Sequence, residues 1–279
     1  MTSATYKDYP NNLINEIKSD GYFSGMLSTS LYNFIVKSVY NDIINKYLKF
    51  KKIKDNTNTF LDLGTNVLNT LSKFNDSELE DCFGHISCRY LSGNSVAIEI
   101  SHKLREYFLS LYSINFSFNG IRDFDRKKIL PNVSEKDTVA IFYRIYSPNK
   151  QYGLPHRDFD FWEIDEELPK IPFRNTSRIK FWMPIVGCNE LNSLRIWPKS
   201  YRSNVKTKYI EGKFRKSPFI DIEDLKKFGS YVVPASKERY FAFFDDKTIH
   251  QGPKNINKDK FGFRISLEAN LFVDSNLLK

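Results

Sequence analysis

Two histidines and one aspartate are the residues of this chain whose types and spacing best suit a metal ion. His156 and Asp158 stand two residues apart in YGLPHRDFDFW, so in an extended chain both side chains leave the same face. His250 lies far downstream in FAFFDDKTIHQGPKN, and each histidine follows a run of β-forming residues. Two imidazoles and one carboxylate form the facial ligand set of non-haem Fe(II) sites, which leaves coordination positions open for substrates.

The His-x-Asp pattern also has an ordinary explanation. Asp158 could cap a turn and leave His156 exposed, and so short a pattern often arises by chance. The other two histidines, His85 and His102, have no metal-binding residues spaced around them. We interpret both as surface or partly buried histidines.

The last β-forming run, FGFRISLEANLF, separates its side chains onto two faces. Alternation puts apolar residues on one face and Arg264, Ser266, Glu268 and Asn270 on the other. The polar face could meet water, as half-buried antiparallel strands usually do. It could instead line a barrel interior, where Arg264 and Ser266 would suit a carboxylate, because the guanidinium fork and the hydroxyl supply converging donors.

Helices in the first half of the chain and strands in the second are expected to position these residues. LINEIKSDGYFSG and LSTSLYNFIVKSVYNDIINKYL are predicted to be helical, and the second places five apolar residues at helical spacing after a cap formed by Ser28, Thr29 or Ser30: Leu31, Phe34, Ile35, Val39 and Ile43. From about residue 138 the chain turns to short β-forming runs, which indicate an antiparallel sandwich or barrel: TVAIFYRIY, RIKFWMPIV, SLRIWP, RYFAFF and FGFRISLEANLF.

These features together resemble the Fe(II)- and 2-oxoglutarate-dependent oxygenases, in particular their phytanoyl-CoA dioxygenase-like branch. HRDFDFW matches that family's His-x-Asp element, and HQGPKN followed by FRISL matches its distal histidine and Arg-x-Ser element. IKSDGYFSGMLS is similar to the Gly-Tyr segment near the family's start. The resemblance covers most of the chain. It implies a mainly β fold with N-terminal helices, the double-stranded β helix (jelly-roll, cupin-like).

The resemblance also implies a role for each matching residue. His156, Asp158 and His250 would hold Fe(II), and Arg264 with Ser266 would bind the distal carboxylate of 2-oxoglutarate. Trp182 and Arg144 are assigned to the same co-substrate site. The reaction would consume O2, oxidise a substrate C–H bond and release succinate and CO2.

One element departs from the family pattern. The usual Pro-Gly-Ser-His reads Pro198-Lys199-Ser200-Tyr201 here, so a phytanoyl-CoA activity is not carried over. A basic insertion follows, with a single acid, Glu211, among six basic residues: Arg202, Lys206, Lys208, Lys213, Arg215 and Lys216. It is either a solvated loop or a lid that recruits an anionic substrate such as a sugar, lipid head group or carrier-linked acyl chain.

Composition sets the remaining expectations. We predict a single oxygenase domain over residues 1–279, with a helical scaffold to about 130, a β core over about 138–272 and an insertion at 199–235. The formal charge of +9 favours anionic partners, but the basic residues form no nucleic-acid signature. Three cysteines without metal-type spacing favour a reducing compartment, hence the cytoplasm, and no apolar run would span a bilayer.

Two other functions stay open at this point. A zinc hydrolase can use two histidines and a carboxylate, with a general base such as Glu163, but Arg264 would then have no role. A noncatalytic cupin-like metal-binding module is also compatible with the ligand set, because bound metal does not prove turnover. The sequence predicts no oligomeric state and does not identify the substrate.

Overall fold

Helices form the first part of the chain and most strands lie in the second part. The computed structural model describes residues 13–52, 60–84, 94–116, 141–148, 153–164, 176–211, 216–256 and 262–278. The first elements are α1 (Leu13–Asp20), β1 (Tyr22–Met26), α2 (Thr29–Lys51), α3 (Phe60–Leu71), α4 (Asp76–Phe83) and α5 (Asn94–Tyr112). The later ones are β2 (Ile141–Tyr146), α7 (Asp158–Ile164), β3 (Thr176–Val186), β4 (Arg195–Ile196), η3 (Ser200–Arg202), β5 (Lys208–Glu211), β6 (Lys216–Phe219), α8 (Ile222–Leu225), η4 (Lys226–Phe228), β7 (Tyr240–Asp245), β8 (His250–Gln251), β9 (Arg264–Asp274) and α9 (Ser275–Leu278).

The helix predicted through LINEIKSDGYFSG was wrong in its second half. The helix α1 ends at Asp20, and Gly21 adopts a φ of +83°, a left-handed conformation that glycine reaches without strain. The chain then continues as β1, which pairs antiparallel with β7. The following helix matches the prediction, because Ser28 caps α2 and the helix buries Leu31 and three further apolar residues at the predicted spacing: Ile35, Val39 and Ile43.

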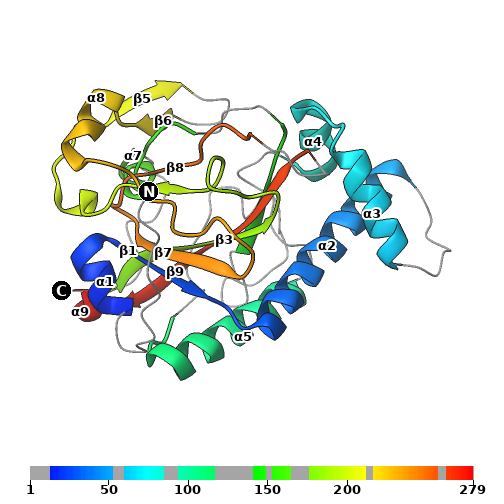
Figure 1. Cartoon of the computed structure of the whole chain (residues 1–279), viewed down its shortest axis with the longest axis horizontal. Helices are drawn as coiled ribbons and strands as arrows, with labels where there is room; N and C mark the ends of the chain where they lie inside the picture. The colour runs from blue at the N-terminus through cyan, green and yellow to red at the C-terminus, as the bar shows by residue number, and fades with distance from the viewer. Residues whose placement is uncertain are drawn as a thin grey trace.

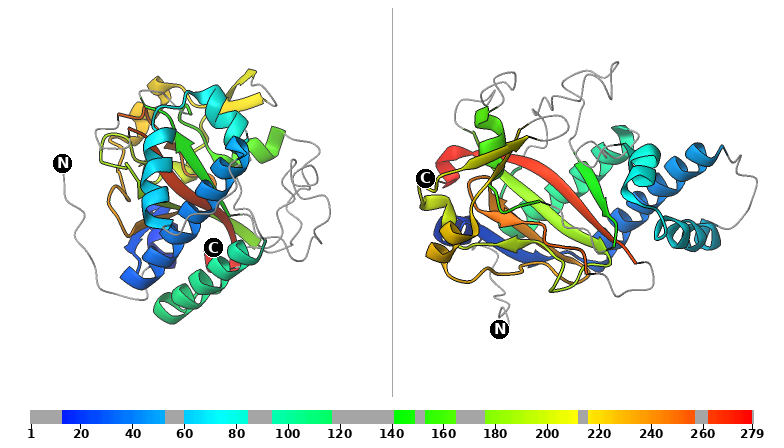
Figure 2. Two further views of the ribbon diagram at one scale, coloured as in Figure 1. Left: turned by 90° about the vertical axis from the view of Figure 1, so that its right-hand side faces the viewer. Right: turned by 90° about the horizontal axis from the view of Figure 1, so that it is seen from above.

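A five-stranded antiparallel sheet in the order β1-β7-β3-β9-β2 is the major sheet of the fold. One face carries the apolar residues of each strand, such as Phe181, Ile265 and Phe243, which pack with the buried faces of the helices in the main core. The helices α2 and α5 run along the sheet (Figures 1 and 2). The alternation that the sequence predicted for β9 is therefore confirmed on its apolar side.

A smaller sheet lies against the other face of the major sheet. It consists of β4 and β8, extended by single bridges from His156 to His250 and from Ile196 to Val232. Trp182 and Phe244 of the major sheet pack with Ile196 of the smaller one. Two antiparallel sheets that enclose a shared interior form the double-stranded β helix, which confirms the predicted fold class.

The polar face of β9 points into this interior and not into water. Arg264 is 2% exposed, Ser266 is 0% exposed and Glu268 is 6% exposed. Of the two possibilities for this strand, contact with water or a place in the barrel interior, the burial of these side chains supports the second.

The segment after β4 packs on the outside of the smaller sheet. Trp197 and Ile249 leave the opposite face from their neighbours Ile196 and His250, and they form a separate cluster with Val205, Ile220 and Leu225. In Figure 1 this segment, which includes β5, β6 and α8, is gathered at the upper left. In the described part of the chain, no helix is both long enough and apolar enough to cross a membrane.

Candidate metal centre

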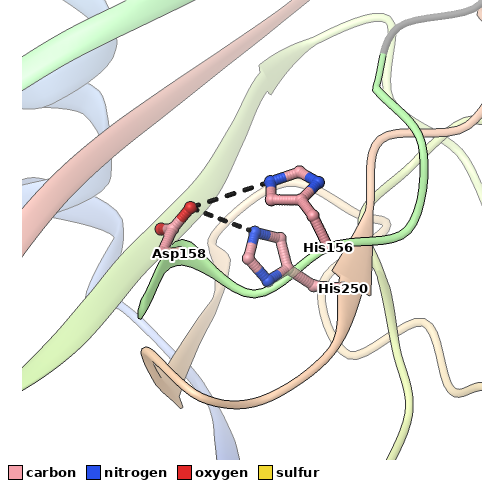
Figure 3. A group of neighbouring side chains, drawn as sticks. All are labelled: His156, Asp158 and His250. Atoms are coloured by element: carbon pink, nitrogen blue, oxygen red, sulfur yellow. Dashed lines mark ion pairs between the residues drawn. The ribbon is translucent and has the colours of Figure 1, made fainter. Parts of the chain in front are cut away.

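The two histidines are held opposite each other by the backbone. The N–H of His156 donates to the carbonyl of His250 at 3.0 Å, and the N–H of His250 donates to the carbonyl of His156 at 3.0 Å. Each ring has its Nδ1 against a carbonyl, that of Leu154 at 2.6 Å for His156 and that of Thr248 at 3.0 Å for His250. These contacts leave both Nε2 atoms directed toward Asp158 (Figure 3).

Asp158, the first residue of α7, is the third member of the group. Its Oδ1 lies 3.7 Å from Nε2 of His156 and 3.6 Å from Nε2 of His250. The three ligand atoms lie within 4.8 Å of one another, close enough to surround one ion. The structure brings together the three residues that the sequence singled out, but not for the predicted reason, since the chain turns into a helix at Asp158 and does not stay extended.

Buried charges around the group keep it in the form that binds a cation. Burial alone would raise the pKa of Asp158, but the charge of the Lys180 ammonium, with a contribution from the adjacent histidines, outweighs it and holds that pKa well below its ordinary value. Burial and the neighbouring His156 lower the pKa of His250, so its ring is neutral at neutral pH. An ionised carboxylate beside a neutral imidazole is ready to accept a dication.

A buried ion network that was not predicted from the sequence lies beside the group. Nζ of Lys180 lies 3.4 Å from Oδ2 of Asp158 and 3.3 Å from Oε2 of Glu268. Oε1 of Glu268 accepts a hydrogen bond from Nε of Arg144 at 2.7 Å. The alternation that puts Trp182 and Arg264 on the inner face also puts Lys180 and Glu268 there, and this signal could have found them.

Arg264 and Ser266 carry buried polar atoms whose hydrogen-bonding capacity is not used. Nε and Nη1 of Arg264 and Oγ of Ser266 are buried and have no hydrogen-bond partner among the residues that the structure describes. The Arg264 guanidinium lies over the Tyr146 ring, 4.1 Å from Cζ to the ring centroid. Buried polar groups normally have partners, so unpartnered donors on an interior face indicate a place for an anionic ligand.

The remaining predicted site residues fall in different places. Trp182 is buried in the interior with Ile196 and Phe244, and Arg144 pairs with Glu268. The basic insertion is described only in part: Lys206 is exposed, Lys208 pairs with Asp221, Lys216 lies 3.5 Å from Glu211, and Lys213 and Arg215 lie outside the described residues. His102 is exposed on α5, while His85 lies outside the described residues.

Comparison with solved structures identifies proteins of similar architecture. EctD from S. alaskensis, crystallised with 2-oxoglutarate and 5-hydroxyectoine, superposes with a TM-score of 0.52 at 13% identity, over 98% of this chain and 79% of EctD. EctD with bound Fe gives a TM-score of 0.51 at 13% identity, over 98% of this chain and 80% of EctD. The chain shares their fold. AviO1 from Streptomyces viridochromogenes Tue57 gives 0.50 at 9% identity, over 97% of each chain.

Sequence comparison alone does not detect this relationship. No protein-family model matches the chain, and no curated protein matches it. At 9–13% identity the likeness to EctD and AviO1 concerns the fold. The functional assignment must therefore come from the residues of the site.

The loop that carries the first two metal-type ligands is tied to the basic insertion. Arg157, between His156 and Asp158, donates to Asp160 through Nε at 2.9 Å and through Nη2 at 2.8 Å. Oγ1 of Thr207 accepts from Nη2 of Arg157 at 2.9 Å and donates to Oδ2 of Asp160 at 2.7 Å. Together these contacts anchor the start of the insertion beside the site.

Replacing Thr207 by valine should loosen this anchor. Valine keeps the shape but removes one hydrogen bond from each of two charged groups, Arg157 and Asp160, which we expect to lower the free energy of unfolding by about 1.5–3 kcal/mol. Denaturant unfolding measures the change. Thr70→Val is the matched control, because Oγ1 of Thr70 donates to the carbonyl of Asn66 in its own helix at a solvent-exposed position and not to a charged group. Equal effects of the two substitutions would contradict the anchoring role.

Gly21 supports the turn before His250 and should not tolerate a side chain. An added Cβ would lie 2.6 Å from Oγ1 of Thr248 and 2.7 Å from Cδ1 of Tyr201, at a φ of +83°. Gly21→Ala should cost about 2–4 kcal/mol of folding free energy through backbone strain and overpacking. It should also weaken metal binding, because the Thr248 carbonyl orients the His250 ring.

The control for that substitution is Gly84→Ala. Gly84 has a φ of +79°, and nothing lies within 4 Å of an added Cβ, so the backbone strain occurs there without crowding. Gly84→Ala should lower thermal stability and leave the affinity for a probe metal ion, Co(II), unchanged. The role of Gly21 in the site would be disproved if Gly21→Ala bound cobalt as tightly as the unaltered protein.

Proposed function

We propose that this protein is a non-haem Fe(II)- and 2-oxoglutarate-dependent dioxygenase of the phytanoyl-CoA dioxygenase-like type. One observation carries the proposal: a single interior contains both a two-histidine, one-carboxylate group and, on Arg264 and Ser266, buried polar atoms without a hydrogen-bond partner among the described residues. Neither a zinc hydrolase nor a simple metal-binding module accounts for that pair. The shared fold with EctD, which was crystallised with Fe and with 2-oxoglutarate, is consistent with the proposal.

The residues of the interior fit both groups. His156, Asp158 and His250 offer two nitrogens and one oxygen, the donor set that suits Fe(II) with positions left open. A buried guanidinium beside a hydroxyl offers donors to the distal carboxylate of 2-oxoglutarate, and that carboxylate would remove the cost of leaving them unpaired. When bound, these groups supply O2-dependent oxidation of a substrate C–H bond, with release of succinate and CO2.

The contribution of the chain is to bind, orient and exclude water. The backbone bridge holds the two imidazoles, while Trp182 and Phe244 give the interior an apolar wall, with the Phe244 ring centroid 4.7 Å from that of His250. Such a wall protects a reactive centre from solvent. No side chain has to act as a general base, so the buried Glu268 is free to keep its ion pairs.

An anaerobic reconstitution tests the assignment. Fe(II) and 2-oxoglutarate should together give a visible charge-transfer absorption, and admission of O2 should then yield succinate. Absorption without succinate would favour the noncatalytic module. Zinc-dependent hydrolysis without the absorption would favour the hydrolase. A general base such as Glu163 would then be needed, and the side chain of Glu163 lies outside the part that the structure describes.

For the substrate we propose a small anionic metabolite, sugar or lipid-linked compound. The support is the net charge of +9 and the basic insertion. Lys208 and Lys216 each face a carboxylate, which weakens their electrostatic attraction for an anion. The cytoplasmic location, and the expectation that nucleic acid is not a partner, likewise remain predictions from composition.

Charge reversal in the insertion tests the substrate class. Replacing Lys206, Lys213 and Arg215 by glutamate should raise the half-saturating concentration of anionic compounds that stimulate succinate release, and added salt should shrink the difference. The same reversal at three lysines of the helical part, Lys37, Lys49 and Lys73, changes the net charge equally and should have no such effect. Stimulation by neutral compounds alone would contradict the proposed anionic substrate.

A further inference from the structure

Asp158 presents its two carboxylate oxygens to different partners. Oδ1 faces Nε2 of His156 at 3.7 Å and Nε2 of His250 at 3.6 Å. Oδ2 lies 3.4 Å from Nζ of Lys180. One oxygen is therefore directed at the space between the histidines, and the other is directed at a buried cation.

Lys180 is itself held on its other side. Its Nζ lies 3.3 Å from Oε2 of Glu268 and 4.7 Å from the centroid of the Phe142 ring, and Glu268 is fixed in turn by Arg144. The side chains of Lys180 and Glu268 are 7% and 8% exposed, so these ion pairs are little screened by water. The ammonium group thus has a defined place between two carboxylates.

The three ligand residues are oriented by two different devices. Each histidine ring is fixed through Nδ1 by a backbone carbonyl, which directs Nε2 at the ion. The Asp158 carboxylate can rotate about its Cβ–Cγ bond, and a side chain, Lys180, opposes that rotation by attracting Oδ2. Lys180 therefore orients the Asp158 carboxylate, just as the backbone carbonyls orient the two histidine rings.

We propose that Lys180 is a positioning residue that keeps Oδ2 of Asp158 away from the ion, so that the carboxylate offers a single oxygen. The inference rests on the proposed function. A carboxylate that used both oxygens would take a position that a 2-oxo acid, binding through two atoms, requires. Lys180 thereby reserves space for the co-substrate without touching it.

Lys180→Met tests the inference, because methionine has a similar length and no charge. Co(II) serves as the metal probe, since it is stable in air and its visible spectrum reports coordination. The variant should still bind Co(II), with an altered spectrum. At saturating Co(II), its dissociation constant for 2-oxoglutarate should rise by about tenfold or more. Lys180→Arg, which keeps the charge, should restore most of the affinity, and Lys37→Met on the exposed face of α2 is the matched control.

The outcomes separate this inference from the proposed function. If the unaltered protein binds Co(II) and 2-oxoglutarate and Lys180→Met does so with the same spectrum and affinity, the positioning role is overturned and the proposed function stands. Complete loss of Co(II) binding in Lys180→Met also overturns it, because Lys180 would then be needed for binding itself. If the unaltered protein binds neither probe, the proposed function fails and the inference falls with it.

A second variant guards against a failure to fold. Removing Lys180 alone leaves Glu268 with less compensation, which is costly for a buried charge. The double variant Lys180→Met/Glu268→Gln removes opposite charges together. It should show the same altered Co(II) spectrum and weakened 2-oxoglutarate binding, and unaltered values would overturn the proposal.

Discussion

Asp158→Ala should abolish Co(II) and Fe(II) binding at micromolar metal and stop succinate formation, while the fold persists. The carboxylate is the only acid of the three-residue group, and without it the two imidazoles face a dication with no negative charge beside them. The loss should exceed the about 10–100-fold effect that follows removal of an outer partner of a metal ligand. Metal titration with a visible or calorimetric readout measures it, and circular dichroism confirms the fold.

Two comparisons make that experiment decisive. Asp81→Ala removes an exposed aspartate from α4 and should leave metal binding unchanged. His156→Ala and His250→Ala should each behave like Asp158→Ala, because the three residues act as one unit. Near-normal turnover by Asp158→Ala would refute the assignment of the metal centre.

Arg264→Lys should weaken 2-oxoglutarate binding by about 10- to 100-fold and leave metal affinity intact. Lysine keeps the positive charge but loses the planar fork, and a charge-assisted hydrogen bond contributes about 1.5–3 kcal/mol. The dissociation constant of 2-oxoglutarate for the Co(II)-loaded protein is the direct measurement. The KM for 2-oxoglutarate should rise in parallel.

Arg178→Lys provides the control for this change. Arg178 is another buried arginine of the major sheet, but its guanidinium is already bonded to Asp246, through Nε at 2.9 Å and Nη2 at 2.5 Å. The substitution should lower thermal stability without a specific effect on 2-oxoglutarate. If the two arginine variants bound 2-oxoglutarate equally well, Arg264 would not be the carboxylate site.

The sequence was sufficient to predict the fold class and to single out most residues of the candidate site. Period-two alternation in β9 already separated the core side from the side that carries Arg264 and Ser266. It did not decide whether the polar side met water, because that depends on a second sheet whose main strands, β4 and β8, are two residues long each. Strands so short leave little periodic signal.

The ion network could not be predicted for a related reason. Contact between Lys180 and Glu268 depends on the register of β3 against β9, in which Trp182 lies opposite Glu268 and Lys180 lies opposite Asn270. A shift of one residue would reverse every side chain, and no local pattern specifies that register. The helical start at Asp158 was missed similarly, since a seven-residue helix that begins inside a ligand motif gives no helical repeat.

The reciprocal backbone bridge between His156 and His250 has a consequence for the order of folding. Forming this bridge closes a loop that contains β3 through β7. Closing a loop costs conformational entropy, and that cost is offset only when those strands have paired. The complete ligand set therefore forms only after this segment has folded, and not in partly folded chains in which it is still open. An ion held by all three side chains would report the folding of this segment, and local opening of the bridge would be expected to weaken its binding.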